Sequence, residues 1–168
     1  MKFNKHKIIS IILARAGSKG LKNKNLAILD NKPLLYYAIE AAKSSKFINK
    51  VYVSTDSEKI KKCAIKYGAE VPFLRKKKFS NDNATTEVTL RNFLDEIKIR
   101  NNIEPEIIVY FQTTDIFRNK ILIDKCIKNL IENKSVDSSF IVTPIHKNFW
   151  MANNKNITRL NKKKIYLP

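Results

Sequence analysis

The amino-acid sequence predicts an α/β fold with a doubly wound, mostly parallel sheet flanked by helices. Two observations predict it: strand-like apolar runs alternate with segments of helical periodicity, and the connections between them are short. The length of 168 residues suits one domain, and only three glycines and five prolines interrupt it. We therefore expect a single domain over residues 1–168.

Two continuous apolar runs, Ile8–Leu13 and Ile107–Phe111, are typical of strands that are buried on both faces of a parallel sheet. Further strands are predicted at Val51–Ser54, Glu70–Leu74 and Ser139–Val142, with another starting at Ile165. Pro72 favours an edge position for its strand, because proline has no N–H group to donate to a neighbouring strand.

Apolar residues at helical spacing predict helices between these strands. Pro33 is expected at the first position of the first helix, where its missing N–H group is not needed. Ser57 is expected to cap the second helix, and Gly68 is expected to end it. The remaining helices are predicted from the end of the loop at residues 75–83 to about Arg100, and from about Lys120 to Glu132.

The chain is strongly basic, with 33 lysines and arginines against 15 acidic residues and a formal net charge of +18. The basic residues are spread from Lys2 to Lys164, so three interpretations stay open: a generic solvated surface, attraction to small polyanions, or nucleic-acid binding. Cys63 and Cys126 lack metal-ligand spacing and are expected to be buried free thiols in a reducing cytoplasm. No segment approaches the roughly 20 apolar residues of a membrane span, so we expect no membrane contact.

Polar residues follow the predicted strands where ligands bind in α/β sheets, beyond the carboxyl ends of the strands. They lie in three segments, Ala14–Asn25, Ser54–Asp56 and Gln112–Arg118. The first segment combines Gly17 and Gly20 with a hydroxyl group and several cations, a composition that suits a phosphate. It lacks the spacing of a Walker A loop, so a basic surface turn remains the alternative.

Four segments in this order resemble motifs of the acylneuraminate cytidylyltransferases, the enzymes that make CMP-sialic acid and related CMP-sugars. They are residues 13–26, Val53-Ser-Thr-Asp56, Leu74-Arg75 with Ser80–Thr86, and Phe111-Gln-Thr-Thr-Asp-Ile-Phe-Arg118. The last of these occupies the place of the family's Leu-Gln-Pro-Thr-Ser-Pro-Leu-Arg motif. The resemblance spans about residues 8 to 150. It implies a nucleotide-diphosphosugar transferase-like fold and transfer of CMP from CTP to a sialic- or legionaminic-type sugar acid, with release of pyrophosphate.

The resemblance also implies roles for individual residues. The CTP phosphates would be held by Arg15, Ser18 and Lys24, with Lys19 and Asn25 in support, and Arg15 and Lys24 would act in catalysis. The cytosine and its ribose would be bordered by Arg75, Ala84 and Thr86, and Gln112 would contact the acceptor sugar. The family further implies Mg²⁺ as cofactor and a homodimer. Without the resemblance, Arg75 could be a surface residue, and Thr85 and Thr86 could be ordinary cap residues.

Two departures from the family pattern qualify these expectations. Asp115-Ile116 replaces the usual Ser-Pro, which would either alter the sugar pocket or reflect a purely structural aspartate. The family's late Asp-x-Asp metal site has no counterpart here, so the metal ligands stay unassigned and we expect a C-terminally truncated chain. A truncated, non-catalytic nucleotide-binding remnant and a basic nucleic-acid-binding module are therefore the alternatives.

Overall fold

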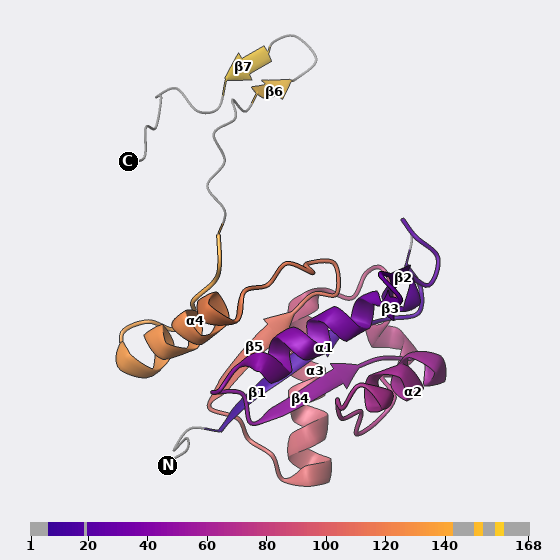
Figure 1. Ribbon diagram of the computed structural model, residues 1–168, viewed down its shortest axis with the longest axis horizontal. Helices are drawn as coiled ribbons and strands as arrows, with labels where there is room; N and C mark the ends of the chain where they lie inside the picture. The colour runs from indigo at the N-terminus through magenta and orange to yellow at the C-terminus, as the bar shows by residue number, and fades with distance from the viewer. Residues whose placement is uncertain (1–6, 19, 143–149, 153–156, 160–168) are drawn as a thin grey trace.

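A three-stranded parallel sheet lies at the centre of the computed structural model, which describes residues 7–18, 20–142, 150–152 and 157–159. The strands are β1 (Ile8–Leu13), β4 (Lys50–Ser54) and β5 (Ile107–Phe111), in the order β4-β1-β5 (Figure 1). In the parallel register, Ile11 of β1 lies between Tyr52 of β4 and Tyr110 of β5. The central position of β1 agrees with its continuous aliphatic sequence, because both of its faces are covered.

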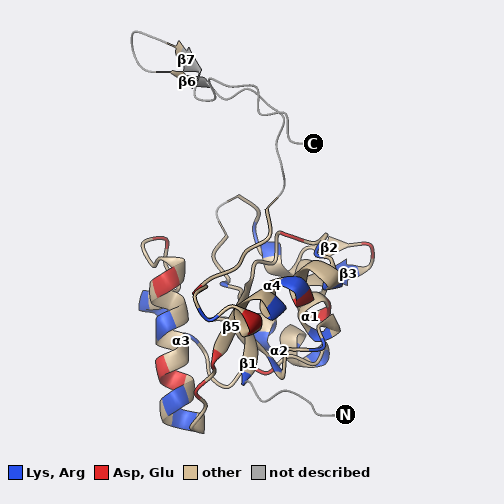
Figure 2. Cartoon of the chain, turned by 90° about the vertical axis from the view of Figure 1, so that its left-hand side faces the viewer, with Lys and Arg blue, Asp and Glu red and all other residues tan. Residues whose placement is uncertain are grey.

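Helices cover both faces of the sheet, which confirms the doubly wound prediction. The helices α1 (Leu34–Ser44), α2 (Glu58–Lys66) and α4 (Lys120–Glu132) lie on one face, and α3 (Thr86–Asn101) lies on the other (Figure 2). Ile8 and Ile12 of β1 pack toward the first group, whereas Ile9 and Ile11 pack toward Phe93 of α3. This alternation follows the two-residue period of a strand.

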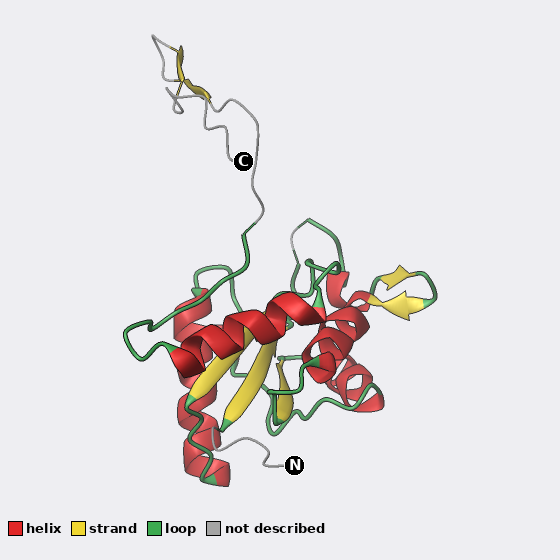
Figure 3. Ribbon diagram, turned by 60° about the vertical axis from the view of Figure 1, so that its left-hand side comes forward, coloured by secondary structure: helices red, strands yellow, loops and turns green. Residues whose placement is uncertain are grey.

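The predicted helices are present, and their ends have the expected chemistry. The Ser57 hydroxyl accepts a hydrogen bond from the Ile60 N–H group, and Gly68 follows α2 with a φ of +86°. Pro33, however, is the residue before α1 rather than its first residue. It ends the short strand β3 (Lys32–Pro33), which pairs with β2 (Ile28–Leu29). Figure 3 shows this small hairpin at the end of α1.

That hairpin was not predicted, although a signal for it exists. Its turn residues, Asp30 and Asn31, have φ values of 45° and 59°. Aspartate and asparagine tolerate positive φ better than other non-glycine residues, and a two-residue hairpin turn of this type needs positive φ at both positions. The Asp-Asn pair therefore predicts a hairpin turn.

Two strand predictions were wrong. Residues 70–74 form only isolated bridges, from Glu70 to Tyr52 and from Leu74 to Thr55. Pro72 lies between the two bridges and has no N–H group to donate to β4, so the pairing is not continuous. Ser139–Val142 has no strand partner in the described part of the chain and is irregular, with Phe140 77% exposed. A hairpin of β6 (Trp150–Ala152) and β7 (Ile157–Arg159) was missed, and the strand expected at Ile165 lies outside the described residues.

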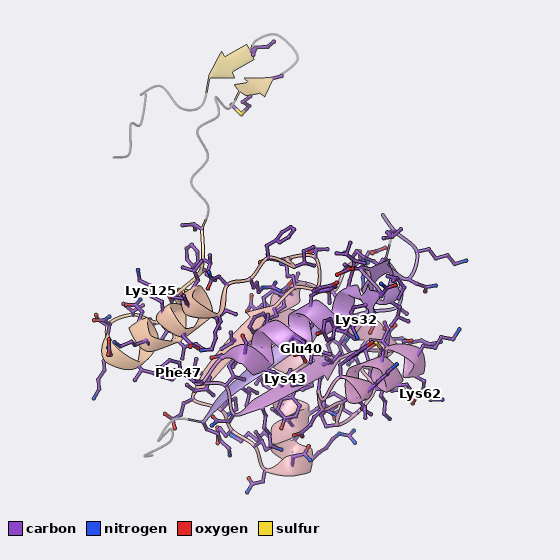
Figure 4. The ribbon with its side chains drawn as sticks, viewed as in Figure 1. Lys32, Glu40, Lys43, Phe47, Lys62 and Lys125 are labelled. Atoms are coloured by element: carbon purple, nitrogen blue, oxygen red, sulfur yellow. The ribbon has the colours of Figure 1, made fainter. Side chains whose placement is uncertain are left out.

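The basic residues are dispersed over several elements and interleaved with acidic ones (Figure 2). On the exposed side of α1, for example, Lys43 pairs with Glu40 at 2.9 Å, while Lys62 and Lys125 lie on other helices (Figure 4). This distribution fits the interpretation of a generic solvated surface better than a single basic face.

Both cysteines are free and partly buried, and burial raises the pKa of the Cys63 thiol. None of the helices in the described part of the chain has the length and hydrophobicity that a membrane crossing requires.

Candidate active site

A cleft of about 450 Å³ opens beyond the carboxyl ends of β1 and β5. The cleft walls include eight of the nine predicted site residues, namely Arg15, Ser18, Lys24, Asn25, Arg75, Ala84, Thr86 and Gln112. The ninth, Lys19, lies outside the described residues. Residues from three separate segments of the chain therefore meet at the edge of the sheet where an α/β fold binds ligands.

Arg15 enters the cleft because the sheet fixes the chain just before it. Ala14 is fully buried, and its N–H group donates to the Ser54 carbonyl oxygen at 3.0 Å, extending the pairing of β1 with β4. The next residue therefore leaves the sheet at its carboxyl edge. The Arg15 guanidinium pairs there with Asp82, with 2.6 Å between Nη2 and Oδ1.

Asp56 holds the start of the first loop. Its Oδ1 atom accepts a hydrogen bond from the Ala16 N–H group at 2.9 Å, across 40 positions of sequence. The sequence placed Asp56 at the ligand edge of the sheet, but the backbone group that it binds could not be foreseen. This bond ties the segment after β1 to the segment after β4.

Asn25 is tied into the protein by both ends of its amide group. Its Nδ2 atom donates to the Arg15 carbonyl oxygen at 2.8 Å, and its Oδ1 atom accepts from the Thr113 hydroxyl at 2.6 Å. Asn25 and Thr113 are each 4% exposed. These bonds fix the position of Asn25 beside Arg15, and its expected role at the CTP phosphates stays a prediction. Sequence reasoning did not identify Thr113 as its partner.

Lys24 and Asn25 are positioned by the same short 3₁₀ helix, η1 (Lys24–Leu26). Leu26 packs against the larger core cluster and so fixes η1 on the body of the protein. In the loop ahead of it Gly17 and Gly20 are not closely packed, because a Cβ atom at either position would meet nothing within 4 Å.

Arg75 is 6% exposed, so the surface alternative for this residue was wrong. Its N–H group donates to the Thr55 carbonyl oxygen at 2.7 Å, and its Nε atom donates to the Ser80 hydroxyl at 2.9 Å. Burial lowers the pKa of the Arg75 guanidinium from its ordinary value, while the negative charge of Asp56 opposes that shift. The cleft therefore contains a buried cation with a fixed orientation.

The start of α3 also contributes to the cleft wall. Thr85 caps this helix by accepting from the Val88 N–H group at 3.2 Å, whereas Thr86 lines the cleft. The Ala84 N–H group donates to the Asn81 side chain at 2.9 Å. The cap and cleft functions are thus divided between two neighbouring threonines, which sequence alone had left open.

Gln112 lies between this cleft and a second cavity of about 590 Å³, because it contributes to the walls of both. Asp115, which stands where the family motif has serine, lines only the second cavity and pairs with Arg118 at 3.2 Å. Arg118 in turn lies over the Phe111 ring, with 4.9 Å from Cζ to the ring centroid. The ion pair gives Asp115 a structural partner, while its place in the wall of the second cavity keeps the sugar-pocket interpretation open.

The described residues assemble no group of three or more histidine, cysteine, aspartate or glutamate side chains that could hold a metal ion. Asp82 is the one acidic side chain among the described residues that line the cleft, and it is already paired with Arg15. The cleft is therefore a cationic site with a single carboxylate.

Comparisons with known proteins agree with this geometry. The family model described as Cytidylyltransferase matches residues 9–167. The chain is 32% identical to a pseudaminic acid cytidylyltransferase of Campylobacter jejuni over 94% of this chain and 68% of the relative. It is 51% identical to an N-acylneuraminate cytidylyltransferase of Escherichia coli over 48% of this chain and 19% of that protein.

Among solved structures, a CMP:2-keto-3-deoxy-manno-octonic acid synthetase complexed with CTP superposes with a TM-score of 0.64 at 18% identity. The match covers 77% of this chain and 49% of that one, so the chain spans about half of that structure. At this identity the likeness shows a shared fold, and it confirms the α/β nucleotidyltransferase-like architecture.

Proposed function

This chain belongs to the cytidylyltransferase family, and on that premise we propose that it transfers CMP from CTP to an acidic sugar with release of pyrophosphate. The observation that carries the proposal is the convergence of eight predicted residues on one cleft at the ligand edge of the sheet. The acceptor class is a nine-carbon 2-keto sugar acid of the sialic, legionaminic or pseudaminic type, as the names of relatives suggest.

The first loop and η1 would hold the triphosphate. Arg15 and Lys24 bring two positive charges to the cleft, and Ser18 adds a hydroxyl group. Charge on the phosphate oxygens changes as pyrophosphate departs, so cations that are fixed in place stabilise the transition state as well as the bound nucleotide. Lys19 belongs to the same proposal through its position in the loop.

The cytidine would lie against the wall formed by Arg75 and the start of α3. Arg75 is buried and oriented by Ser80, so its charge stays in one place. Ala84 leaves room for a base to approach, and the Thr86 hydroxyl can donate or accept a hydrogen bond. A site of this kind can distinguish bases through hydrogen bonds to their polar edges.

The acceptor would approach from the side of Gln112, where the two cavities adjoin. Its anomeric hydroxyl oxygen attacks the α-phosphorus of CTP, the bond from that phosphorus to the bridging oxygen breaks, and pyrophosphate leaves in line. The hydroxyl proton is released as the new bond forms. No covalent intermediate with the protein is needed, so positioning of the two substrates supplies much of the rate enhancement.

Mg²⁺ would arrive mainly on the phosphates of CTP. Protein sites often bind this ion through one or two carboxylates together with substrate phosphates and water, and it reduces the charge on the phosphates when bound. The described cleft offers Asp82 alone as an acidic ligand. The protein residues in the proposal therefore bind and orient the nucleotide without a preformed metal cage.

We further propose a cytoplasmic homodimer. Two free cysteines suit a reducing compartment. Exposed apolar side chains on α4 and beyond it, including Ile121 at 73% and Phe140 at 77%, offer surface that a second subunit could cover.

Nucleotide preference tests the proposed function directly. Thermal melts with CTP, UTP, ATP and GTP should show the largest stabilisation with CTP, and a tenfold affinity preference corresponds to about 1.4 kcal/mol. Pyrophosphate release should then require both CTP and a sugar acid. Equal thermal shifts with all four nucleotides would contradict the proposal.

A further inference from the structure

Asp82 and Arg15 form an ion pair inside the cleft that the proposed function assigns to the nucleotide. The distance between Arg15 Nη2 and Asp82 Oδ1 is 2.6 Å, and the two side chains are 32% and 45% exposed. They are 67 positions apart in sequence: Arg15 follows β1, and Asp82 precedes α3. Both line the cleft, so a ligand that enters meets the pair itself.

The carboxylate of Asp82 and a phosphate group compete for the same kind of partner. A guanidinium group binds carboxylate and phosphate oxygens through the same N–H donors and with similar geometry. A polyphosphate in this cleft can therefore take over the donor that Asp82 now uses. A polyphosphate that leaves Asp82 in place still lies beside a negative charge, which weakens its binding.

Asp56 provides the contrast within the same site. Its Oδ1 atom accepts a hydrogen bond from a backbone group, the Ala16 N–H, and Asp56 does not line the cleft. Its partner is therefore part of the main chain and not a cationic side chain. Asp82 instead pairs with a side chain that is itself the expected phosphate ligand, so its contact changes when phosphate arrives.

We propose that Asp82 is an exchangeable counter-ion of the polyphosphate site. It neutralises Arg15 when the cleft is empty, yields those donors to the phosphates of CTP, and pairs with Arg15 again as pyrophosphate leaves. Asp82 thereby weakens the binding of pyrophosphate and favours its release. This inference rests on the proposed function, because it requires polyphosphate to bind at Arg15.

The test is calorimetric titration of wild-type protein and Asp82→Asn with pyrophosphate and with CTP, each in the absence of Mg²⁺, so that loss of a carboxylate ligand to the metal does not affect the result. The substitution keeps the shape of the side chain and removes its charge. We expect the dissociation constants of Asp82→Asn to fall by about threefold or more, given the strength of charge interactions at the protein surface. Asp82→Glu, which restores the charge, should return them toward the wild-type values.

The matched control is Asp95→Asn on α3, which changes the net charge by the same amount. Asp95 is exposed and does not line the cleft, so its loss should change the dissociation constants by less than about 1.5-fold at moderate salt. An equal effect of both substitutions would overturn the proposal, because it would reflect net charge alone. When Arg15 is replaced by glutamine, Asp82→Asn should change the dissociation constants less than it does in the wild-type protein. An equally large change in the Arg15→Gln protein would show that Asp82 does not act through Arg15, and would overturn the proposal.

Unchanged or weaker pyrophosphate binding by Asp82→Asn would overturn the inference, since Asp82 would then have no effect or would help to position Arg15. A thermal melt establishes that the variant is folded, and Asp82→Ser replaces it if it is not. A different result would contradict the proposed function itself: wild-type protein that binds neither CTP nor pyrophosphate. If the wild-type protein binds CTP and pyrophosphate but Asp82→Asn binds them no more tightly, the proposed function stands and only the inference about Asp82 is overturned.

Discussion

The Thr113 hydroxyl donates a hydrogen bond of 2.6 Å to Oδ1 of Asn25, 88 positions earlier in the chain. Both residues are 4% exposed, so the bond lies within the protein, beside the cleft. The other end of the Asn25 amide holds the Arg15 carbonyl oxygen at 2.8 Å. The segment after β5, which carries Gln112, is thus connected to the backbone of the residue expected to hold the phosphates. Proline, which the family motif has in place of Thr113, could not donate this hydrogen bond.

Replacing Thr113 with valine should lower both stability and activity. Valine has nearly the same shape but no donor, so Asn25 Oδ1 would be left buried and unpaired, which costs about 1–3 kcal/mol in unfolding free energy. Activity should fall further than stability explains, because the Arg15 backbone loses part of its support. Urea unfolding and steady-state pyrophosphate release measure the two effects.

Thr113→Ser is the matched control, because serine retains the hydroxyl group. It should keep the value of kcat/KM within about threefold, although it creates a small cavity. If the valine variant unfolds and turns over like the wild type, the hydrogen bond contributes neither stability nor positioning.

The elements with strong local patterns could be predicted from sequence. The bounds of β1, β5 and α4 agree with the prediction, because each is a continuous apolar run or a periodic apolar face with polar residues at its ends. Residues 70–74 and 139–142 were harder, since a short apolar run becomes a strand only where a neighbouring strand accepts it. That information lies in tertiary structure rather than in the run itself.

The membership of the cleft could also be predicted, but the contacts inside it could not. The resemblance supplied Arg15, Arg75 and Gln112, and the structure places all three on one cleft. The partners Asp82 and Thr113 were missed because their contacts span 67 and 88 positions of sequence. Polar residues just after a buried strand indicate which segments of the chain lie at the ligand-binding edge of the sheet. They do not indicate which side chains in those segments contact each other.

Glu96 should make the stability of the protein sensitive to acid. Hydrogen bonds from Lys76 and Arg100 hold the pKa of Glu96 below its ordinary value. A carboxyl group with a lowered pKa in the folded state stabilises the fold above its unfolded pKa of about 4.3, and that contribution is lost as the pH falls toward the folded value. Glu96→Gln should therefore melt lower than wild type at pH 7, and the difference should close below about pH 4.

Glu40→Gln on α1 is the control for this pH series. Glu40 forms one ion pair, with Lys43, and its side chain is 41% exposed, whereas Glu96 is 14% exposed and contacts two cations. The control should therefore lose less stability at pH 7. A constant difference between Glu96→Gln and wild type from pH 7 to pH 3 would show that ionisation of Glu96 is not involved.

Asp115→Asn distinguishes the structural interpretation of this residue from a role in sugar binding. The Asp115 side chain is 63% exposed and pairs with Arg118, so its loss should change unfolding free energy by less than about 1 kcal/mol. On the structural interpretation, the KM for the sugar acid should stay within about twofold of wild type, because the carboxylate is engaged by Arg118. A tenfold rise in that KM with unchanged kcat would instead place Asp115 in the acceptor pocket.

Arg15→Lys is the strongest test of the phosphate site. Arginine presents a planar fork that can bind two phosphate oxygens, or a phosphate and Asp82 in succession, whereas lysine offers a single ammonium group. Because the charge on those oxygens changes as pyrophosphate departs, the loss should appear in the transition state as well as in binding. We expect kcat/KM to fall by about 100-fold or more, equivalent to about 2.7 kcal/mol. The melting temperature should stay near wild type, since Arg15 is partly exposed and a long cation remains.

Arg91→Lys on α3 makes the same substitution at a site 74% exposed and outside the cleft, and should leave both measurements unchanged. Near-normal kinetics for Arg15→Lys would show that Arg15 is only a surface charge, and the assignment of the first loop to phosphate binding would fail with it.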